Sequence, residues 1–322
     1  RQALYDVPER PIEISGPDAV SFLNLIFSRR IENLNIGRGY YSISCTSDGG
    51  TFMDGILFKL SDDRFWFVQP DGDMNTWLLA HKNDFNVDIS DPNSRVLQLQ
   101  GPSSLKIMEA ASKGQIDSNF KYFNSGFFMI DGQEVYVSRT GWSGELGYEI
   151  YTQGEKTDCP ALWNYLLKVG MPKGMLFSSM QSINIRRIEA GILDSGSDFD
   201  TTMTPFEAGL GKFVDLTKEA FIGREALLKL NAPNETRIYG VQCEEFTPQG
   251  GFKIFDGKNE VGSVTTGAYS PYLKLGIGYV RFNSISNWDG KNLIMQTVDK
   301  QLFSCEILSL PFYDKEKELP RM

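Results

Sequence analysis

A strand, a Gly-Pro turn and a helix follow one another twice in this sequence, and this repeat limits the fold more than any other feature. The first copy covers residues 11–26, with Gly16-Pro17 at its turn, and the second covers residues 96–108, with Gly101-Pro102. In both copies an alternating strand precedes the dipeptide, and apolar residues at helical spacing follow it. The shared order predicts an internal duplication of an α+β unit.

Strands are predicted between the two copies, over residues 40–45, 51–60 and 64–68. Asp54 is unusual there, because it is an acid in the middle of a strand-forming run, where side chains are usually apolar or β-branched. Gly50 and Gly55 flank it, so another group can approach the backbone closely. Two interpretations are open: Asp54 is a functional carboxylate, or it lies on the solvated face of the strand.

Residues 139–150 have the composition of a binding turn between two strands. Three glycines in this stretch, at positions 141, 144 and 147, allow a close approach to the backbone or a positive φ. Trp142, Glu145 and Tyr148 are then left to make contacts. A glycine-rich hairpin without a ligand is the alternative interpretation.

A helix is predicted over residues 179–190, with Ser178 and Gln181 as a capping box. Arg187 falls on its apolar face, at helical spacing from Ile183, whereas Arg186 points elsewhere. A guanidinium that points inward needs an anion. Glu189 and the carboxylate of a ligand are both candidates.

The pattern changes near residue 231 to short strands with frequent Gly and Pro, which predicts a separate antiparallel β domain. Residues 231–235 are the expected linker. We therefore expect an α+β region over residues 1–230, made of two interleaved α+β domains, and a barrel-like β domain over residues 235–322.

Composition excludes several classes of function. His81, at a predicted helix end, is the single histidine, which excludes His-rich metal sites and disfavours a Ser-His-Asp triad. Four dispersed cysteines fit a reducing compartment, and we expect a cytoplasmic protein. A net charge of −9 argues against nucleic acid, and the absence of a long apolar run argues against a membrane span. The acidic loop 194–205 lacks the EF-hand glycine and closing glutamate, so we expect no metal.

Nine segments, taken in order, resemble the glycine-cleavage T-protein family of tetrahydrofolate-dependent aminomethyl- and methyltransferases. They are ISGPDA (14–19), DGGTFMD (48–54), LQGP (99–102), RTGWSGELGYEI (139–150), RIEAG (187–191), TPFE (204–207), FIGR (221–224), GSVTTG (262–267) and IGYV (277–280). The resemblance covers nearly the whole chain. It implies a three-lobed cloverleaf ring of duplicated α+β domains and a C-terminal antiparallel β domain, with tetrahydrofolate in the centre.

The resemblance also implies roles for single residues. Asp54 corresponds to the catalytic aspartate, and Glu145 to the glutamate that accepts hydrogen bonds from the pterin. Trp66 corresponds to the aromatic residue that packs against folate, and Arg187 to the arginine near its glutamyl tail. Tyr148 is a further expected folate contact.

Some positions depart from the aminomethyltransferase pattern. Trp142 replaces a usual Tyr, residues 69–71 read Gln-Pro-Asp, and Ser195 stands where Tyr is frequent. The first two changes resemble the branch that demethylates dimethylsulfoniopropionate. Residues 219–224 lack the cysteine of the relative that serves iron–sulfur cluster maintenance.

Our hypothesis from the sequence is therefore methyl transfer from a small sulfonium, ammonium or other methylated donor to N5 of tetrahydrofolate. Trp142, Trp66 and Tyr148 are candidates to hold the onium ion, with Trp142 as the substrate residue. One alternative is aminomethyl transfer from a lipoylated carrier protein, and another is a folate-binding module without catalysis. A monomer or a homodimer fits each of them.

Overall fold

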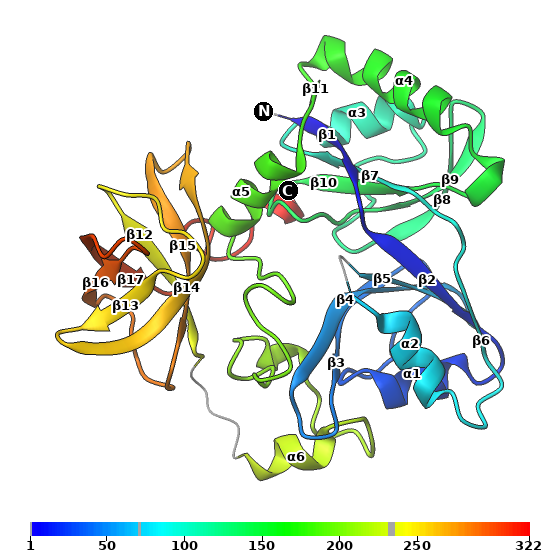
Figure 1. Ribbon diagram of the computed structural model, residues 1–322. Helices are drawn as coiled ribbons and strands as arrows, with labels where there is room; N and C mark the ends of the chain where they lie inside the picture. Colours follow the sequence, from blue (N-terminus) through cyan, green and yellow to red (C-terminus); the bar gives the residue numbers. More distant parts are fainter. Residues whose placement is uncertain (1, 70–71, 231–235) are drawn as a thin grey trace.

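The computed structural model describes residues 2–69, 72–230 and 236–322, so the expected linker 231–235 and two of the residues in 69–71 lie outside the described residues. Sheets, helices and a closed barrel make a mixed α+β fold (Figure 1). No described helix has both the length and the apolar composition that a bilayer span requires.

The first sheet has the strand order β3-β4-β5-β2-β6. Its strands are β2 (Arg10–Ser15), β3 (Gly39–Cys45), β4 (Thr51–Ser61), β5 (Arg64–Gln69) and β6 (Asp88–Ser90). Helices α1 (Ala19–Ile26) and α2 (Met74–His81) cover one face, where Phe22 and Leu78 pack against Leu57 and Phe67. His81 ends α2, as the sequence predicts.

The second sheet has the order β11-β1-β7-β10-β9-β8. Its strands are β1 (Ala3–Val7), β7 (Val96–Gln100), β8 (Ser125–Ile130), β9 (Gln133–Ser138), β10 (Gly147–Tyr151) and β11 (Leu176–Phe177). Helices α3 (Ser104–Ala111) and α4 (Cys159–Gly170) cover its outer face, and their apolar residues form a second core with β7, β9 and β10.

The two predicted strand–turn–helix copies are present as β2–α1 and β7–α3. Their turn glycines share an unusual backbone, with φ of +131° at Gly16 and +122° at Gly101. β2 pairs with β5, which pairs with β4, and in the same way β7 pairs with β10, which pairs with β9. The inner faces of the two sheets meet in a third core that includes Tyr5, Trp66 and Tyr151, so the layers run helix, sheet, sheet, helix (Figure 1).

Helix α5 (Met180–Glu189) leads from this body towards the barrel. The predicted capping box does not form: Ser179 is the N-cap and makes no side-chain cap bond. Instead, the Ser178 and Ser182 hydroxyls lie 2.6 Å apart. The loop after α5 contains a 3₁₀ turn (Gly211–Phe213) and is followed by α6 (Arg224–Lys229).

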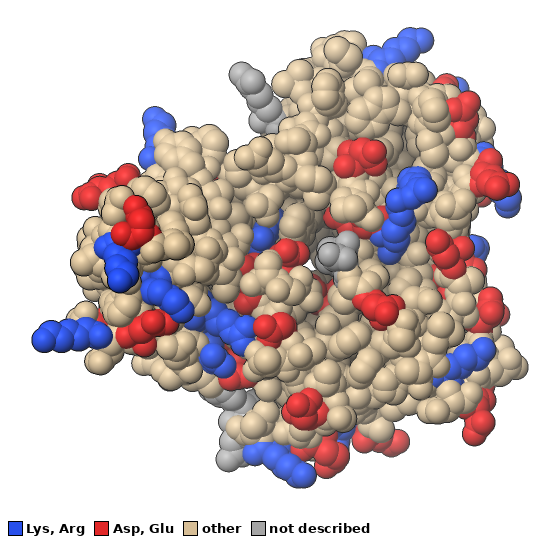
Figure 2. Space-filling model, in the orientation of Figure 1, with Lys and Arg blue, Asp and Glu red and all other residues tan. Residues whose placement is uncertain are grey.

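The C-terminal β domain is a closed barrel in the order β12-β15-β14-β13-β16-β17. Its strands are β12 (Ile238–Cys243), β13 (Lys253–Asp256), β14 (Asn259–Ser270), β15 (Leu275–Phe282), β16 (Asn292–Gln296) and β17 (Leu302–Leu308). After the barrel, the chain returns to the middle of the molecule and ends beside a 3₁₀ turn, Leu319–Arg321 (Figure 1). On the face in Figure 2, acidic and basic side chains are mixed, and both occur in the hollow between the barrel and the rest of the molecule.

Candidate active site

Asp54 lies in β4 and is 7% exposed, so the interpretation as a solvated carboxylate is wrong. Its Oδ2 accepts a hydrogen bond from the Tyr41 hydroxyl at 2.6 Å. Its Oδ1 is buried and has no hydrogen-bond partner within the described part of the chain. Because an unpaired buried carboxylate oxygen is unfavourable, Oδ1 is suited to accept a hydrogen bond from a bound N–H or O–H group.

Burial raises the pKa of Asp54 to about 6, the hydrogen bond from Tyr41 opposes this shift, and the negative charge of Asp194 adds to it. The carboxyl group therefore exchanges its proton close to neutral pH. A group with such a pKa can hold or release a proton during a reaction, which is the property expected of a catalytic acid or base.

The glycines that flank Asp54 allow other parts of the protein backbone, and not a ligand, to approach closely. A Cβ on Gly50 would lie 2.0 Å from the carbonyl oxygen of Thr201, and one on Gly55 would lie 2.4 Å from that of Val68. The Thr51 amide also donates to the Met203 carbonyl at 2.7 Å. The groups that approach β4 closely are therefore the loop after α5 and the neighbouring strand.

The glycine-rich turn between β9 and β10 packs on the side chain of Gln100. A Cβ on Gly141 would lie 2.1 Å from Gln100 Nε2, and one on Gly147 would lie 2.2 Å from Gln100 Oε1. Gly144 has φ +69° and lies against Ala190 at the end of α5. The predicted close approach to the turn is real, and the approaching group is a buried glutamine.

Gln98 and Gln100 of β7 orient this turn through hydrogen bonds. The Trp142 amide donates to Gln98 Oε1 at 3.3 Å, and the Ser143 hydroxyl donates to Gln100 Oε1 at 2.6 Å. Sequence analysis did not identify either glutamine. The available signal is their alternation with Val and Leu over residues 96–100, which places polar side chains on one face of a strand that is buried throughout.

Glu9, in the connection between β1 and β2, is a second buried acid that sequence analysis missed. Its Oε1 accepts from Gln98 Nε2 at 3.4 Å, and its Oε2 has no partner among the described residues. Burial raises the pKa of Glu9 to about 7, and the nearby Glu149 carboxylate adds to the shift. Gln98 Nε2 also donates to Glu149 Oε1 at 2.9 Å, so this amide lies between two carboxylates.

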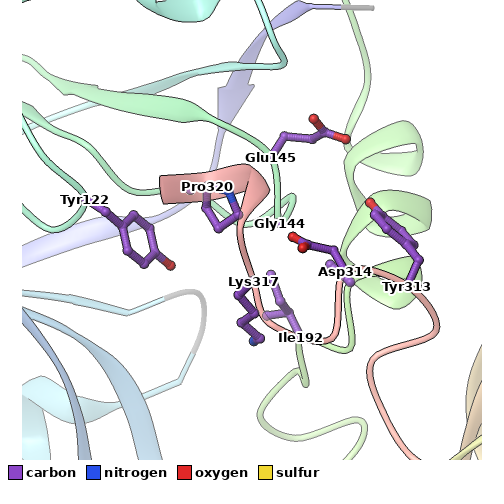
Figure 3. A pocket seen from close by; sticks show the side chains of 10 residues that line it. Tyr122, Gly144, Glu145, Ile192, Tyr313, Asp314, Lys317 and Pro320 are labelled. Carbon is purple, nitrogen blue, oxygen red and sulfur yellow. The ribbon is translucent and has the colours of Figure 1, made fainter. Parts of the chain in front are cut away.

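Glu145 lines a small pocket together with Gly141 and Gly144 of the same turn (Figure 3). Ala190 and Ile192, after α5, form part of another wall. The remaining lining comes from Tyr122 and from the C-terminal residues Tyr313, Asp314, Lys317 and Pro320. The turn therefore holds Glu145 at a pocket wall, and its role as a ligand contact stays a prediction.

Arg186 connects Glu145 to two other groups, which was not predicted from the sequence. Its guanidinium makes ion pairs with Glu145 and with the buried Glu189. The same side chain donates to the Tyr313 hydroxyl at 2.7 Å. Glu189, one of the two expected partners of Arg187, is therefore paired with Arg186.

Arg187 points inward as predicted, and its anionic partner from the protein is Asp198 and not Glu189. Its Nη1 lies 2.5 Å from Oδ2 of Asp198 in the loop after α5. The guanidinium also donates to Asn184 Oδ1 at 2.8 Å and to Thr266 Oγ1 at 3.3 Å. Because the protein supplies these acceptors, the inward position of Arg187 does not require a ligand carboxylate.

The three aromatic residues expected to hold an onium ion are not gathered in one place, because Trp66 and Trp142 pack in the third core and Tyr148 packs in the second. Trp66 is 1% exposed between the two sheets and donates from Nε1 to Glu13 at 2.8 Å. Tyr148 belongs to the core on the opposite face of the second sheet, under α3 and α4. The ring of Trp142 has the Arg187 guanidinium 5.3 Å from its centre. Each ring has a protein partner, so these three side chains do not form an aromatic cage.

Comparison with known proteins gives two matches to protein families. Residues 3–218 match the GCVT N-terminal domain, and residues 237–314 match the glycine cleavage T-protein C-terminal barrel domain. Together these matches cover most of the chain and include every residue of the candidate site up to Asp314.

Full-length relatives give the same result. An aminomethyltransferase of Bacillus pumilus (strain SAFR-032) is 32% identical over 326 residues, with 98% of this chain and 88% of the relative covered. One of Lysinibacillus sphaericus (strain C3-41) is 30% identical over 329 residues, with the same coverage. The crystal structure of glycine cleavage system aminomethyltransferase T from Bartonella henselae has a TM-score of 0.87 at 24% identity, and covers 98% of this chain and 87% of that one. At that identity the structure supports the shared fold alone.

Proposed function

Since the chain belongs to the glycine cleavage T-protein family, we propose that it is a tetrahydrofolate-dependent one-carbon transferase that moves an aminomethyl group. The observation that carries the proposal is the buried Asp54 carboxyl group, with one unpartnered oxygen and a pKa raised to about 6. A bystander on a strand surface would be exposed or fully hydrogen-bonded.

Two carboxyl groups have the acceptor atoms that a reduced pterin requires. Glu145 is half-buried at the pocket wall, where its carboxylate can accept hydrogen bonds from N–H donors of a heterocycle. Asp54 Oδ1 is a second acceptor without a donor from the described residues. We therefore assign folate recognition to Glu145 and the reacting centre to Asp54.

Tetrahydrofolate supplies the nucleophilic nitrogens N5 and N10, to which a one-carbon unit is attached. Transfer would form bonds from N5 and N10 to the methylene carbon and break the bonds from that carbon to the carrier sulfur and to the amine nitrogen. Ionised Asp54 would stabilise positive charge on the aminomethyl group, and Oδ1 would relay a proton released by the folate nitrogens to the departing ammonia, while the other proton goes to the carrier thiolate. Tyr41 keeps the carboxylate oriented through its bond to Oδ2. Glu145 would fix the orientation of tetrahydrofolate, which accepts the one-carbon unit.

This proposal replaces methyl transfer as the preferred reaction. The relatives are named aminomethyltransferases, and Trp142, which favoured methyl transfer, has its ring against Arg187. Under the proposal the donor is a lipoylated carrier protein. We also propose that the two sheet-and-helix units and the barrel form a three-lobed ring, and that folate binds in it near Glu145.

The test is to incubate the protein with tetrahydrofolate and separate donors. One arm contains an aminomethylated lipoyl carrier, and the others contain sulfonium, quaternary ammonium and aryl methyl ether compounds. We expect 5,10-methylenetetrahydrofolate and ammonia in the carrier arm. Formation of 5-methyltetrahydrofolate in another arm would reinstate methyl transfer. Folate binding without product in any arm would favour a non-catalytic folate module.

A further inference from the structure

The C-terminal residues 313–322, here called the C-terminal segment, form one side of the pocket that contains Glu145 (Figure 3). Tyr313 connects the segment to Arg186, and the Met322 carbonyl accepts a hydrogen bond from the buried Arg139. Pro320 is buried between these two attachments. The segment therefore crosses from the barrel to the second sheet and covers the pocket.

Most of the segment lies beyond the residues that match the barrel domain. The match to the barrel domain ends at residue 314, whereas Lys317 and Pro320 line the pocket. Asp314 stabilises the turn of the segment, because its carboxylate accepts from the Glu318 amide at 2.9 Å and the Leu319 amide at 3.0 Å. Two of the residues that line the pocket thus lie beyond the matched barrel domain.

Lys317 is a cation without an anionic partner at this pocket. Within residues 2–69, 72–230 and 236–322, its ammonium group makes no hydrogen bond or ion pair. Burial lowers the pKa of Lys317, the positive charges of Lys212 and Arg321 lower it further, and the Asp314 carboxylate opposes the shift. Because Asp314 makes no ion pair with this partly buried ammonium and does not cancel the shift, binding of a further anion there would be favourable.

The pocket therefore has a carboxylate on one wall and an unpaired ammonium on another. A ligand that fits both carries N–H donors on one part and a negative charge on another. Arg187, the residue expected near the folate tail, is already paired with Asp198. We propose that Lys317 binds a carboxylate of the glutamyl tail of folate, while Glu145 binds its pterin.

This inference rests on the proposed function, since folate is the ligand in both. The cavity between Glu145 and the C-terminal segment is only about 30 Å³, which holds a few water molecules at most. Folate binding therefore requires the segment to move outward. Lys317 would favour that movement by exchanging a partly buried position without an ion pair for an ion pair with the ligand.

The test compares two ligands and three proteins in binding titrations. The ligands are 5-formyltetrahydrofolate, which has the glutamyl carboxylates, and 6-methyltetrahydropterin, which lacks them. The proteins are the wild type, Lys317→Met and Lys315→Met; Lys315 is an exposed lysine of the same segment, so both variants change the net charge equally. We expect Lys317→Met to weaken 5-formyltetrahydrofolate binding about tenfold, as for loss of one hydrogen-bonded ion pair.

The same variant should leave 6-methyltetrahydropterin binding unchanged, and Lys315→Met should change neither ligand. Lys317→Arg, which keeps the charge, should retain most of the affinity for 5-formyltetrahydrofolate. If Lys317→Met weakened both ligands equally, or neither, the inference would be overturned while the proposed function remained. Wild-type protein that bound neither ligand would overturn both. Equal melting temperatures of the variants exclude misfolding as the cause.

Discussion

The Arg187 guanidinium lies 2.5 Å from the Asp198 carboxylate, and the two side chains are 2% and 0% exposed. Asp198 also accepts from Thr265 of β14 at 2.7 Å. The pair therefore connects α5, the loop after it and the barrel. An arginine that the sequence suggested for ligand binding is a structural link between the two parts of the chain.

Asp198→Ala leaves Arg187 buried without its anion. We expect the free energy of unfolding to fall by about 3–5 kcal/mol, as for other broken buried pairs. Urea denaturation measures this change. Asp200→Ala is the matched control, because Asp200 is 45% exposed in its pair with Arg281 and should contribute at most about 1 kcal/mol. Equal effects of the two substitutions would show that the buried pair has no special role.

Gly141→Ala tests the packing of the glycine-rich turn. The added methyl group would lie 2.1 Å from Gln100 Nε2, so the glutamine or the turn must shift. We expect a loss of about 1–3 kcal/mol of stability and weaker folate binding, since Glu145 follows in the same turn. Gly126→Ala is the control, because its Cβ would meet Phe128 at an ordinary 3.4 Å. If Gly141→Ala bound folate with wild-type affinity, the packing of the turn would not contribute to ligand recognition.

Glu145→Gln tests the pterin contact. The amide can accept on one atom only, whereas a carboxylate accepts two parallel N–H donors, so folate affinity should fall about tenfold or more. Titration with a reduced folate gives the measurement. Glu244→Gln, at an exposed position in the barrel, is the control for the loss of one charge. A folate affinity unchanged by Glu145→Gln would show that Glu145 does not bind the pterin.

Local patterns predicted the elements of the fold well. The strand expected over residues 51–60 is β4 (Thr51–Ser61), and the helix expected over 179–190 is α5 (Met180–Glu189). Such elements depend mainly on side-chain periodicity and on turn residues, which are visible in sequence. The two Gly-Pro turns were found for the same reason.

Contacts between distant elements could not be predicted in this way. The loop 194–205 contains several acids, and Asp198 is selected as the partner of Arg187 because β14 places Thr265 beside it. Trp66 is buried because the inner faces of two sheets meet, which no single strand reveals. Arg186 was not predicted to be a site residue because helical periodicity places it off the apolar face. Its own face of the helix is nevertheless the one that Glu145 and Tyr313 contact.

The raised pKa of Asp54 predicts a pH-dependent stability difference. The carboxyl group has a pKa of about 6 in the folded protein, against an ordinary value of 3.8 for an aspartate, so the folded state holds this proton more tightly. The contribution of Asp54 to the free energy of unfolding therefore falls by roughly 3 kcal/mol in total as the pH rises from about 4 to about 6. Asp54→Asn does not titrate.

The stability of Asp54→Asn relative to the wild type should accordingly increase between pH 4 and pH 8. Urea denaturation of both proteins at several pH values measures the difference, and subtraction cancels the titration of groups common to both. A difference that stayed constant with pH would mean that the carboxyl group has an ordinary pKa and is not suited to proton transfer near pH 6.

The most direct measurement of the central claim is single-turnover transfer from an aminomethylated lipoyl carrier to tetrahydrofolate, with wild-type protein and Asp54→Asn. The account predicts that the wild type forms 5,10-methylenetetrahydrofolate and ammonia. It predicts that Asp54→Asn still binds folate but transfers at least about 100-fold more slowly, as for loss of a general acid–base group. Wild-type protein that formed no product, or an Asp54→Asn rate within a few-fold of the wild type, would contradict it.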